Sequence, residues 1–295
     1  KAFRRTSRIN PLQDLGITQK GVAGETIIPK ITSKAVNNLT DKYGYFDVVI
    51  ARHVLEHAID AKDFLSLIWN VLNPGGYIVF EVPDCNKEMD NNDYTMPWEE
   101  HILYFVPETL KAFFTYTSYD LVQLKLYPFQ TEDIQIVIVQ KIESSKKKNL
   151  DYVSADTSPE VFKKFEDYAH GFFQYKKIIN AYLKEYFLSV GKIAFFGAGH
   201  RAIMYIKGME IEGFIDFIID DMELKKNLYL AGTSLQIKSS ESLEKENISL
   251  CLLCVSIQHE DKIIKKFHKF VNKGGIFASI HNMQEKSLFK RAIGK

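Results

Sequence analysis

The sequence predicts an α/β protein that contains two Rossmann-like sheets joined by a linker and a long helix. Short apolar runs rich in β-branched residues alternate with stretches whose apolar residues recur at helical spacing, a pattern typical of parallel βαβ units. This alternation occurs twice, once between residues 46 and 139 and again between residues 192 and 280. The chain has 295 residues, which is enough for two domains of roughly 100 to 200 residues each.

The first sheet becomes recognisable after residue 45, because the preceding residues carry only a short helical pattern after Asn10. Residues 46–51 (FDVVIA) form a short apolar strand, which we expect to be covered on both faces. A helix with one apolar face follows and ends at the Asn-Pro-Gly-Gly turn of residues 73–76, before a strand over 77–82. In such a βαβ unit, ligands bind at the carboxyl ends of the strands, here the loop 52–57 and the residues after 82.

A helix is predicted from Pro107, and two strands over 121–126 and 134–139 close the first region. The charged, serine-containing segment 141–149 has the composition of a linker.

Ser158 and Pro159 predict the start of a long helix, since serine caps helices well and proline fits the first helical position. An aromatic stripe runs along this helix from Phe162 to Tyr186. We interpret the stripe as packing between domains rather than as a surface that stacks bases or sugars.

A second α/β unit follows, with a strand at 193–196, a Gly-Ala-Gly turn, a helix at 200–209 and a strand at 214–219. Two further strands, 250–255 and 275–280, enclose a helix at 260–271. The predicted organisation is therefore a first domain over 1–142, a linker and helix over 143–190, and a C-terminal domain over 191–295.

Composition limits the classes of function. Lys and Arg number 38 against 37 Asp and Glu, so the net charge of +1 gives no reason to expect nucleic acid or an anionic membrane as partner. The three cysteines are too few for a disulfide framework, and we expect Cys251 and Cys254 to be core thiols on opposite strand faces. No apolar run approaches the roughly 20 residues that cross a bilayer. We therefore expect a cytoplasmic monomer or homodimer whose partner is a small molecule.

Three polar constellations follow predicted strands. The first is the loop from Arg52 to His57, with histidines at 53 and 57, which lies where a cofactor rests on a parallel sheet. The second is Trp98-Glu99-Glu100-His101, whose adjacent acid and imidazole suit proton abstraction. Each has an alternative interpretation. His57 can be a hydrogen-bonded loop residue, and the second constellation can be a solvated acidic turn with a structural histidine.

The third constellation is Gly197-Ala198-Gly199-His200-Arg201-Ala202, with Asp220 about 20 residues further on. It matches a dinucleotide fingerprint, in which backbone amides receive phosphate and the acid receives a ribose hydroxyl, and Arg201 adds a cation. A tight packing turn without a nucleotide explains the same residues equally well.

The "FDVV…HVLEH…LNPGG" run of residues 46–76 resembles the latter half of class I S-adenosylmethionine-dependent methyltransferases. Combined with Glu100-His101, the FFGAGH run of 195–200 and Asp220, it is similar to the sugar C-methyltransferase family. The resemblance covers about residues 45–282. It implies methyl transfer from S-adenosylmethionine to a ring carbon of a nucleotide-linked keto-deoxysugar.

The resemblance also assigns roles. It implies that His101 is the base, that Glu100 orients it or binds a sugar hydroxyl, and that Arg52, His53 and His57 line the cofactor cleft. Asn10 is expected at the end of a strand, where the family tends to carry an acid for the ribose. The residues assigned to substrate binding are Trp98, Gly197, Gly199, His200, Arg201 and Asp220.

The sequence departs from the family at several points. Trp98 stands where the family often carries a tyrosine, and Gly16, Gly21 and Gly24 lack the strand and spacing of the glycine-rich cofactor loop. No zinc-binding cysteine set is present, so we expect no metal in this chain and zinc only in a missing N-terminal domain. The chain is thus expected to be the last two-thirds of such an enzyme. The alternatives are a nicotinamide-dependent oxidoreductase or epimerase that uses Gly197–Ala202, and a non-catalytic remnant that binds nucleotide-sugar.

Overall fold

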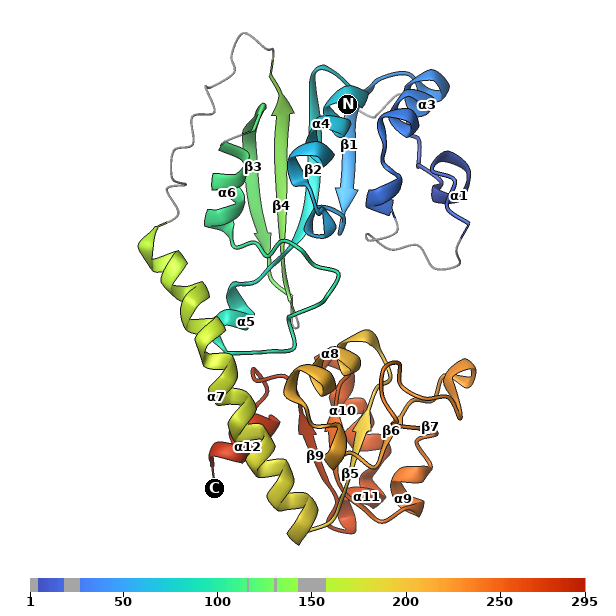
Figure 1. Ribbon diagram of the computed structural model, residues 1–295, viewed down its shortest axis with the longest axis vertical. Coiled ribbons are helices and arrows are strands. Elements are labelled where there is room, and N and C mark those ends of the chain that lie inside the picture. The colour runs from blue at the N-terminus through green and yellow to red at the C-terminus, as the bar shows by residue number, and fades with distance from the viewer. Residues whose placement is uncertain (1–4, 19–26, 116, 130–131, 143–157, 295) are drawn as a thin grey trace. The chain divides into compact units, whose positions relative to one another are not determined.

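The computed structural model describes residues 5–18, 27–115, 117–129, 132–142 and 158–294 (Figure 1). Most of the predicted linker, and Gly21 and Gly24, lie outside these ranges. The chain divides into two compact units, and each is described by itself. The first comprises Lys1–Cys85 and Glu99–Phe162, and the second comprises Asn86–Trp98 and Lys163–Lys295.

The first unit contains one mixed sheet and the helices that cover it. Its helices are α1 (Pro11–Asp14), α3 (Ser33–Tyr43), α4 (Ala61–Val71) and α6 (Pro107–Thr115), with 3-10 turns at Ile28–Lys30 and Leu55–His57. Its strands are β1 (Phe46–Arg52), β2 (Leu72–Asp84), β3 (Tyr119–Tyr127) and β4 (Asp133–Lys141), in the order β1-β2-β4-β3. Strands β1 and β2 are parallel, which confirms the predicted βαβ unit, and β4 is antiparallel to both of its neighbours.

The glycines between α4 and the main part of β2 allow the chain to reverse. Phe46 pairs with Leu72 and Val48 pairs with Tyr77, so residues 73–76 form an irregularity against β1. Gly75 has φ +73°, a conformation that glycine adopts without steric cost. The predicted turn is thus built into the start of β2.

Only one face of this sheet is covered by helices of the described chain. Apolar side chains of α3, α4 and α6 share one buried cluster with Ile78, Phe80 and Val82 of β2 and with Val137 and Val139 of β4. The expectation that β1 is covered on both faces is wrong, because no residue of β1 is buried and Ile50 is 64% exposed. Strand β1 lies at the edge of the sheet. Val49 and Ala51 pack against the buried cluster, whereas Ile50 points to the opposite face and is exposed.

The second unit is an all-parallel sheet with helices on both faces. Its helices are α5 (Asn86–Asp90), α7 (Pro159–Ser189, which begins in the first unit), α8 (His200–Met209), α9 (Ser242–Lys245), α10 (Ile257–Lys266), α11 (His268–Asn272) and α12 (Leu288–Ile293), with 3-10 turns at Glu212–Phe214 and Glu223–Lys225. Its strands are β5 (Lys192–Phe196), β6 (Phe217–Ile219), β7 (Ile237–Lys238), β8 (Ile248–Leu253) and β9 (Ile276–Ser279). In chain order the sheet β7-β6-β5-β8-β9 reads 3-2-1-4-5, which is the Rossmann strand order without its sixth strand, and the switch point lies between β5 and β8.

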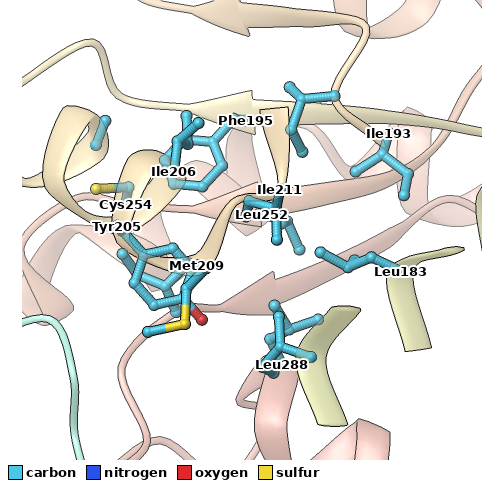
Figure 2. Close-up of a cluster of buried hydrophobic side chains, with 14 of the residues drawn as sticks. Leu183, Ile193, Phe195, Tyr205, Ile206, Met209, Ile211, Leu252, Cys254 and Leu288 are labelled. Atoms are coloured by element: carbon cyan, nitrogen blue, oxygen red, sulfur yellow. The ribbon is translucent and has the colours of Figure 1, made fainter. Parts of the chain in front are cut away.

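Alternate residues of β5 and β8 belong to two separate buried clusters. One cluster joins Ile193 and Phe195 to side chains of α7, α8 and α12, as Figure 2 shows. The other joins Ala194 and Phe196 to side chains of α9, α10 and α11. Cys251 and Cys254 fall into different clusters, which confirms buried thiols on opposite faces. Burial raises the pKa of the Cys254 thiol to about 12, so it is not a nucleophile near neutral pH.

The aromatic stripe of α7 packs into the second unit. Tyr175, Tyr182 and Tyr186 are buried in the same cluster as Phe195, whereas Phe162 at the start of the helix is exposed. The buried part of the stripe therefore packs inside one unit, where we predicted packing between domains. None of the helices in the described part of the chain is long and apolar enough to span a membrane.

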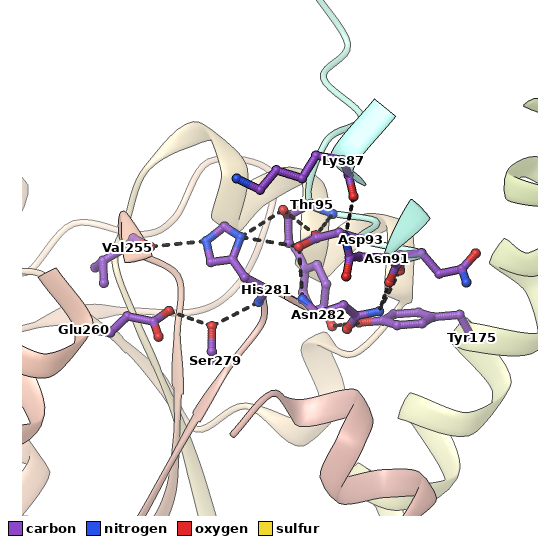
Figure 3. A network of polar contacts seen from close by, with 12 residues as sticks. Lys87, Asn91, Asp93, Thr95, Tyr175, Val255, Glu260, Ser279, His281 and Asn282 are labelled. Atoms are coloured by element: carbon purple, nitrogen blue, oxygen red, sulfur yellow. Dashed lines mark hydrogen bonds and ion pairs between the residues drawn. The ribbon is translucent and has the colours of Figure 1, made fainter. Parts of the chain in front are cut away.

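Residues 86–98 belong to the second unit, although the predicted first domain of 1–142 includes them. Asp93 ties these residues to the second unit. Its carboxylate accepts from Thr95 N–H (3.0 Å), Thr95 Oγ1 (2.7 Å) and Asn282 N–H (3.0 Å) (Figure 3). His281 lies against the same group, with Nδ1 3.8 Å from Asp93 Oδ2 and 3.1 Å from Thr95 Oγ1. This buried polar network joins the segment to the end of β9.

Candidate functional site

The carboxyl ends of β1 and β2 carry a cross-strand ion pair. Arg52 and Glu81 are register partners on these parallel strands. Arg52 Nε and Nη2 donate to the two oxygens of Glu81 at 2.8 Å each, in a bidentate pairing. The guanidinium holds the pKa of Glu81 below its usual value, so this end of the sheet carries a fixed pair of charges.

His53 is held between two carboxylates directly after β1. Its Nδ1 lies 3.3 Å from Glu56 Oε1, and its Nε2 lies 3.2 Å from Glu81 Oε1. The backbone of His53 has φ +49°, a left-handed conformation that few residues other than glycine adopt and that brings the ring to this position. Glu56 and then Glu81 raise the pKa of His53 above its usual value, although partial burial opposes the shift.

The 3-10 turn Leu55–His57 presents Glu56 toward the same region. The side chain of Glu56 is only 1% exposed. The Glu56 carbonyl accepts from Ile102 N–H at 2.8 Å and from Leu103 N–H at 3.0 Å. These two bonds hold the residues that follow His101 against the end of β1.

His57 and His101 lie beside each other in the first unit. Their ring centroids are 4.8 Å apart, and the rings are nearly perpendicular at 86°. His57 Nδ1 is 3.0 Å from the Glu100 carbonyl oxygen, a hydrogen bond when Nδ1 carries the proton. The structure thus brings His53, His57, Glu100 and His101 to one end of the sheet, with Glu100 contributing its backbone carbonyl.

Asn10 does not occupy the expected position. Residues 5–10 form no strand, and Asn10 is the N-cap of α1, where Oδ1 accepts from Leu12 N–H (3.0 Å) and Gln13 N–H (3.4 Å). The prediction that Asn10 ends a strand is therefore wrong. An Asn-Pro pair is a favourable start for a helix, and here this local preference determines the structure.

The Gly-Ala-Gly turn lies at the switch point of the second sheet, between β5 and α8. Gly197 N–H donates to Ile219 O at 2.8 Å, and Ala198 N–H donates to Asp220 Oδ2 at 3.1 Å. Lys225 Nζ bonds both Ala198 O (2.9 Å) and Asp220 Oδ2 (3.0 Å). The turn and its acid are therefore bonded to each other.

Asp220 is engaged at both oxygens, since Oδ1 accepts from Met222 N–H at 2.9 Å. Burial opposes ionisation, but the bonds from Met222, Lys225 and Ala198 hold the pKa of Asp220 below its usual value. In a dinucleotide fingerprint this acid would receive a ribose hydroxyl. The observed bonding favours the packing turn over that interpretation.

Trp98 and His200 form a flat aromatic pair in the second unit. Their ring centroids are 4.5 Å apart with an interplanar angle of 15°. Arg201 follows in α8, and its Nε is buried without a hydrogen-bond partner among the described residues. Of the residues assigned to the substrate, the structure therefore stacks Trp98 on His200, beside the Gly197 turn.

Glu56 and Glu81 are site residues that sequence reasoning missed. Glu56 is inside the HVLEH run, and Glu81 is the one acid in the apolar run of residues 77–82, so both carried a signal. A glutamate is almost never buried unless it is paired. A glutamate within an apolar run is therefore a better candidate for a site residue than an acid in a turn. The Asp93 network had no comparable local signal.

Replacing Gly197 with alanine is expected to destabilise the second unit by about 1–3 kcal/mol. Gly197 has φ +111°, and an added Cβ would lie 2.3 Å from the Cys254 carbonyl oxygen. Gly199→Ala is the matched control, since its Cβ would meet no atom within 4 Å. Hydrogen exchange of the β5 and β8 amides measures the difference, and equal protection in the two variants would contradict the expectation.

Comparison with known protein families finds two matches, which together cover most of the chain. Residues 10–124 match a family described as a methyltransferase domain, and residues 135–280 match one described as a C-methyltransferase C-terminal domain. A SAM-dependent methyltransferase from Methanosarcina mazei is similar at 16% identity and a TM-score of 0.25, over 33% of this chain and 59% of that protein. The N-methyltransferase NodS from Bradyrhizobium japonicum is similar at 16% identity and a TM-score of 0.26, over 41% of this chain and 82% of NodS. No curated protein matches the sequence.

The first unit, with polar groups at the ends of its parallel strands, is thus a methyltransferase domain of the Rossmann-like class. The second match, to a C-methyltransferase C-terminal domain, covers most of the remaining chain. The protein thus carries a methyltransferase domain followed by a C-methyltransferase C-terminal domain.

Proposed function

We propose that the protein is a SAM-dependent C-methyltransferase that acts on a nucleotide-linked keto-deoxysugar, with His101 as the base. The observation that carries this proposal is the cluster of His57, His101 and Glu56 at the carboxyl end of β1. It combines imidazole groups with a buried carboxylate where ligands of parallel sheets bind. The order of a methyltransferase domain and a C-methyltransferase C-terminal domain supports the reaction class.

The fit of the described residues to S-adenosylmethionine is partial. Arg52, His53 and His57 present polar groups at the ends of the strands, as a cofactor site requires. Within the described part of the first unit, no glycine-rich loop follows a strand that precedes β1. When bound, the cofactor supplies an electrophilic methyl group.

The base removes a proton from the carbon beside the sugar ketone. That C–H bond breaks, the proton goes to the basic nitrogen of His101, and the electron pair forms an enolate. Glu56 has a carboxylate oxygen within 4.8 Å of a His101 nitrogen, so it stabilises the imidazolium that results. The bound cofactor would supply its electrophilic methyl group to this enolate carbon, and its sulfur would keep the electrons of the broken bond.

The flat pair of Trp98 and His200 is assigned to the nucleotide part of the substrate. Nucleobases stack on aromatic faces without requiring a particular sequence or base, and an arginine suits phosphate recognition. Trp98, His200 and Arg201 supply these two chemistries within the second unit. The Gly197 turn positions the start of α8, from which His200 and Arg201 project.

Deuterium exchange separates proton abstraction from methyl transfer. The full-length protein is incubated in D₂O with a panel of nucleotide-linked keto-deoxysugars, with and without S-adenosylmethionine. We expect one deuterium at the carbon beside the ketone without cofactor, and a mass increase of one methyl group with it. A panel in which no member gains deuterium or a methyl group, although S-adenosylhomocysteine binds in calorimetry, would refute this substrate class.

A further inference from the structure

Three potential metal ligands converge at the end of β1 in the first unit. Glu56 and His57 come from the 3-10 turn Leu55–His57, and His101 comes from the segment that precedes α6. One ligand atom from each of these residues lies within 4.8 Å of the others. The convergence is fixed by the backbone, because Glu56 O accepts from both Ile102 and Leu103 N–H.

Glu56 provides a second, independent observation. Its side chain is 1% exposed, yet neither carboxylate oxygen has a hydrogen-bond partner in the described part of the chain. The nearest charged group, His53 Nδ1, is 3.3 Å from Oε1 in an ion pair without hydrogen-bond geometry. A buried carboxylate without hydrogen bonds is costly unless it is paired with a cation or coordinates a metal. The ion pair with His53 offsets part of this cost, and neither carboxylate oxygen of Glu56 has a hydrogen bond in the described part of the chain that would compete with a metal ion.

His57 has the orientation that metal ligands commonly show. Its Nδ1 lies 3.0 Å from the Glu100 carbonyl oxygen, so a proton on Nδ1 is donated to the backbone and Nε2 keeps its lone pair. Metal-binding histidines almost always donate their other N–H in this way, to a carbonyl or a carboxylate. The Glu100 carbonyl would thus set the tautomer of His57.

The geometry points to a divalent transition-metal site formed by Glu56, His57 and His101, of the kind that binds Zn²⁺ or Co²⁺. Two imidazoles and one carboxylate suit these ions, and three protein ligands leave a position open for water or substrate. In a tetrahedral zinc site the ligand atoms are about 3.3 Å apart. Side-chain rotations that close the present separations, all within 4.8 Å, would complete the site.

The metal and the proposed base use the same imidazole. A neutral imidazole has one basic nitrogen, so His101 either coordinates a metal ion or accepts a proton. Metal binding, which does not depend on the methyl-transfer proposal, would therefore inhibit proton abstraction by His101.

Titration of the untagged, chelator-treated protein with Co²⁺ tests the site. We expect one equivalent to bind, with visible absorption bands of a low-coordinate ion, and Zn²⁺ to displace it. Glu56→Gln and His101→Ala are each expected to weaken Co²⁺ binding at least about 10-fold. Glu56→Gln preserves the size of the buried side chain, and circular dichroism checks that both variants fold.

The controls are matched by residue type and burial. Glu88→Gln changes a second buried glutamate, and His268→Ala changes an exposed histidine. Both are expected to bind Co²⁺ as the unmodified protein does. Absence of Co²⁺ binding, or binding that survives Glu56→Gln and His101→Ala, would overturn the proposal. Because the titration contains neither cofactor nor sugar, its outcome is independent of the methyl-transfer assay.

Discussion

His101→Ala is expected to lower the rate of methyl transfer by about 10²- to 10⁴-fold, the usual contribution of a positioned general base. Without the imidazole, no group in this position accepts the proton from the carbon beside the ketone. The side chain of His101 lies beside His57 and is partly exposed, so its removal leaves the buried cluster of the first unit intact. The measurement is the initial rate at saturating cofactor and sugar, together with calorimetric binding of S-adenosylhomocysteine.

Two further measurements separate a catalytic role from a structural one. Added imidazole is expected to restore part of the rate of His101→Ala, because it supplies the missing base from solution. Glu100→Gln is expected to have a smaller effect, since the Glu100 contact with His57 is made by the backbone carbonyl. A rate that stays within a factor of a few of the unmodified protein in His101→Ala would exclude His101 as the base.

Asp93→Asn is expected to destabilise the second unit by about 3–5 kcal/mol, the cost of removing one partner of a buried ion pair. Asp93 is fully buried and accepts from Thr95 and from the Asn282 N–H, with His281 beside it. Thr95 N–H, Thr95 Oγ1 and Asn282 N–H all donate to the Asp93 carboxylate. An asparagine would replace one carboxylate oxygen with an amide group that is itself a donor. Hydrogen exchange of the β8 and β9 amides, followed by mass spectrometry, reports the stability of this unit.

The same residue predicts a pH dependence. Burial opposes ionisation of Asp93, but His281 and the bonds from Thr95 hold its pKa below the usual value. A lowered pKa in the folded state contributes stability that is present above the unfolded pKa of about 3.9 and is lost as the pH falls through the folded pKa. Protection of the second unit should therefore decrease below about pH 4, and Asp93→Asn should flatten this decrease.

Asp261→Asn is the matched control for this residue. Asp261 is an exposed aspartate in α10 of the same unit, so its substitution should change protection by less than about 0.5 kcal/mol. If Asp93→Asn behaved like Asp261→Asn, at neutral or acidic pH, Asp93 would not anchor residues 86–98.

Local signals predicted most of the elements. The helix of residues 200–209 has the predicted bounds, and α7 begins at Pro159 as its cap residues indicate. The exposure of β1 could not be predicted in this way, because a run of apolar residues does not show which faces have neighbours. The expected position of Asn10 at a strand end came from the family resemblance alone, whereas the helical pattern that follows Asn10 in the sequence makes it the N-cap of α1.

The candidate site was predicted only in part, for a physical reason. His53, His57 and His101 can be recognised because they lie in polar runs that follow predicted strands and because histidine titrates near neutral pH. The contact of Asp93 with Asn282 joins residues 189 positions apart, and such a pair has no local pattern. Burial of Glu56 likewise depends on backbone bonds to Ile102 and Leu103, which only the folded chain brings near.

The membership of residues 86–98 in the second unit changes how the protein can be divided for engineering. A chimera cut in the segment 143–157 would combine one protein's Asp93 with another protein's His281 and Asn282, and would break the buried network. The exchangeable module is a discontinuous one, residues 86–98 together with residues from 163 onward. One junction of such a chimera follows Trp98, which is three residues before His101. Any exchange of the two units therefore places a junction next to the proposed base.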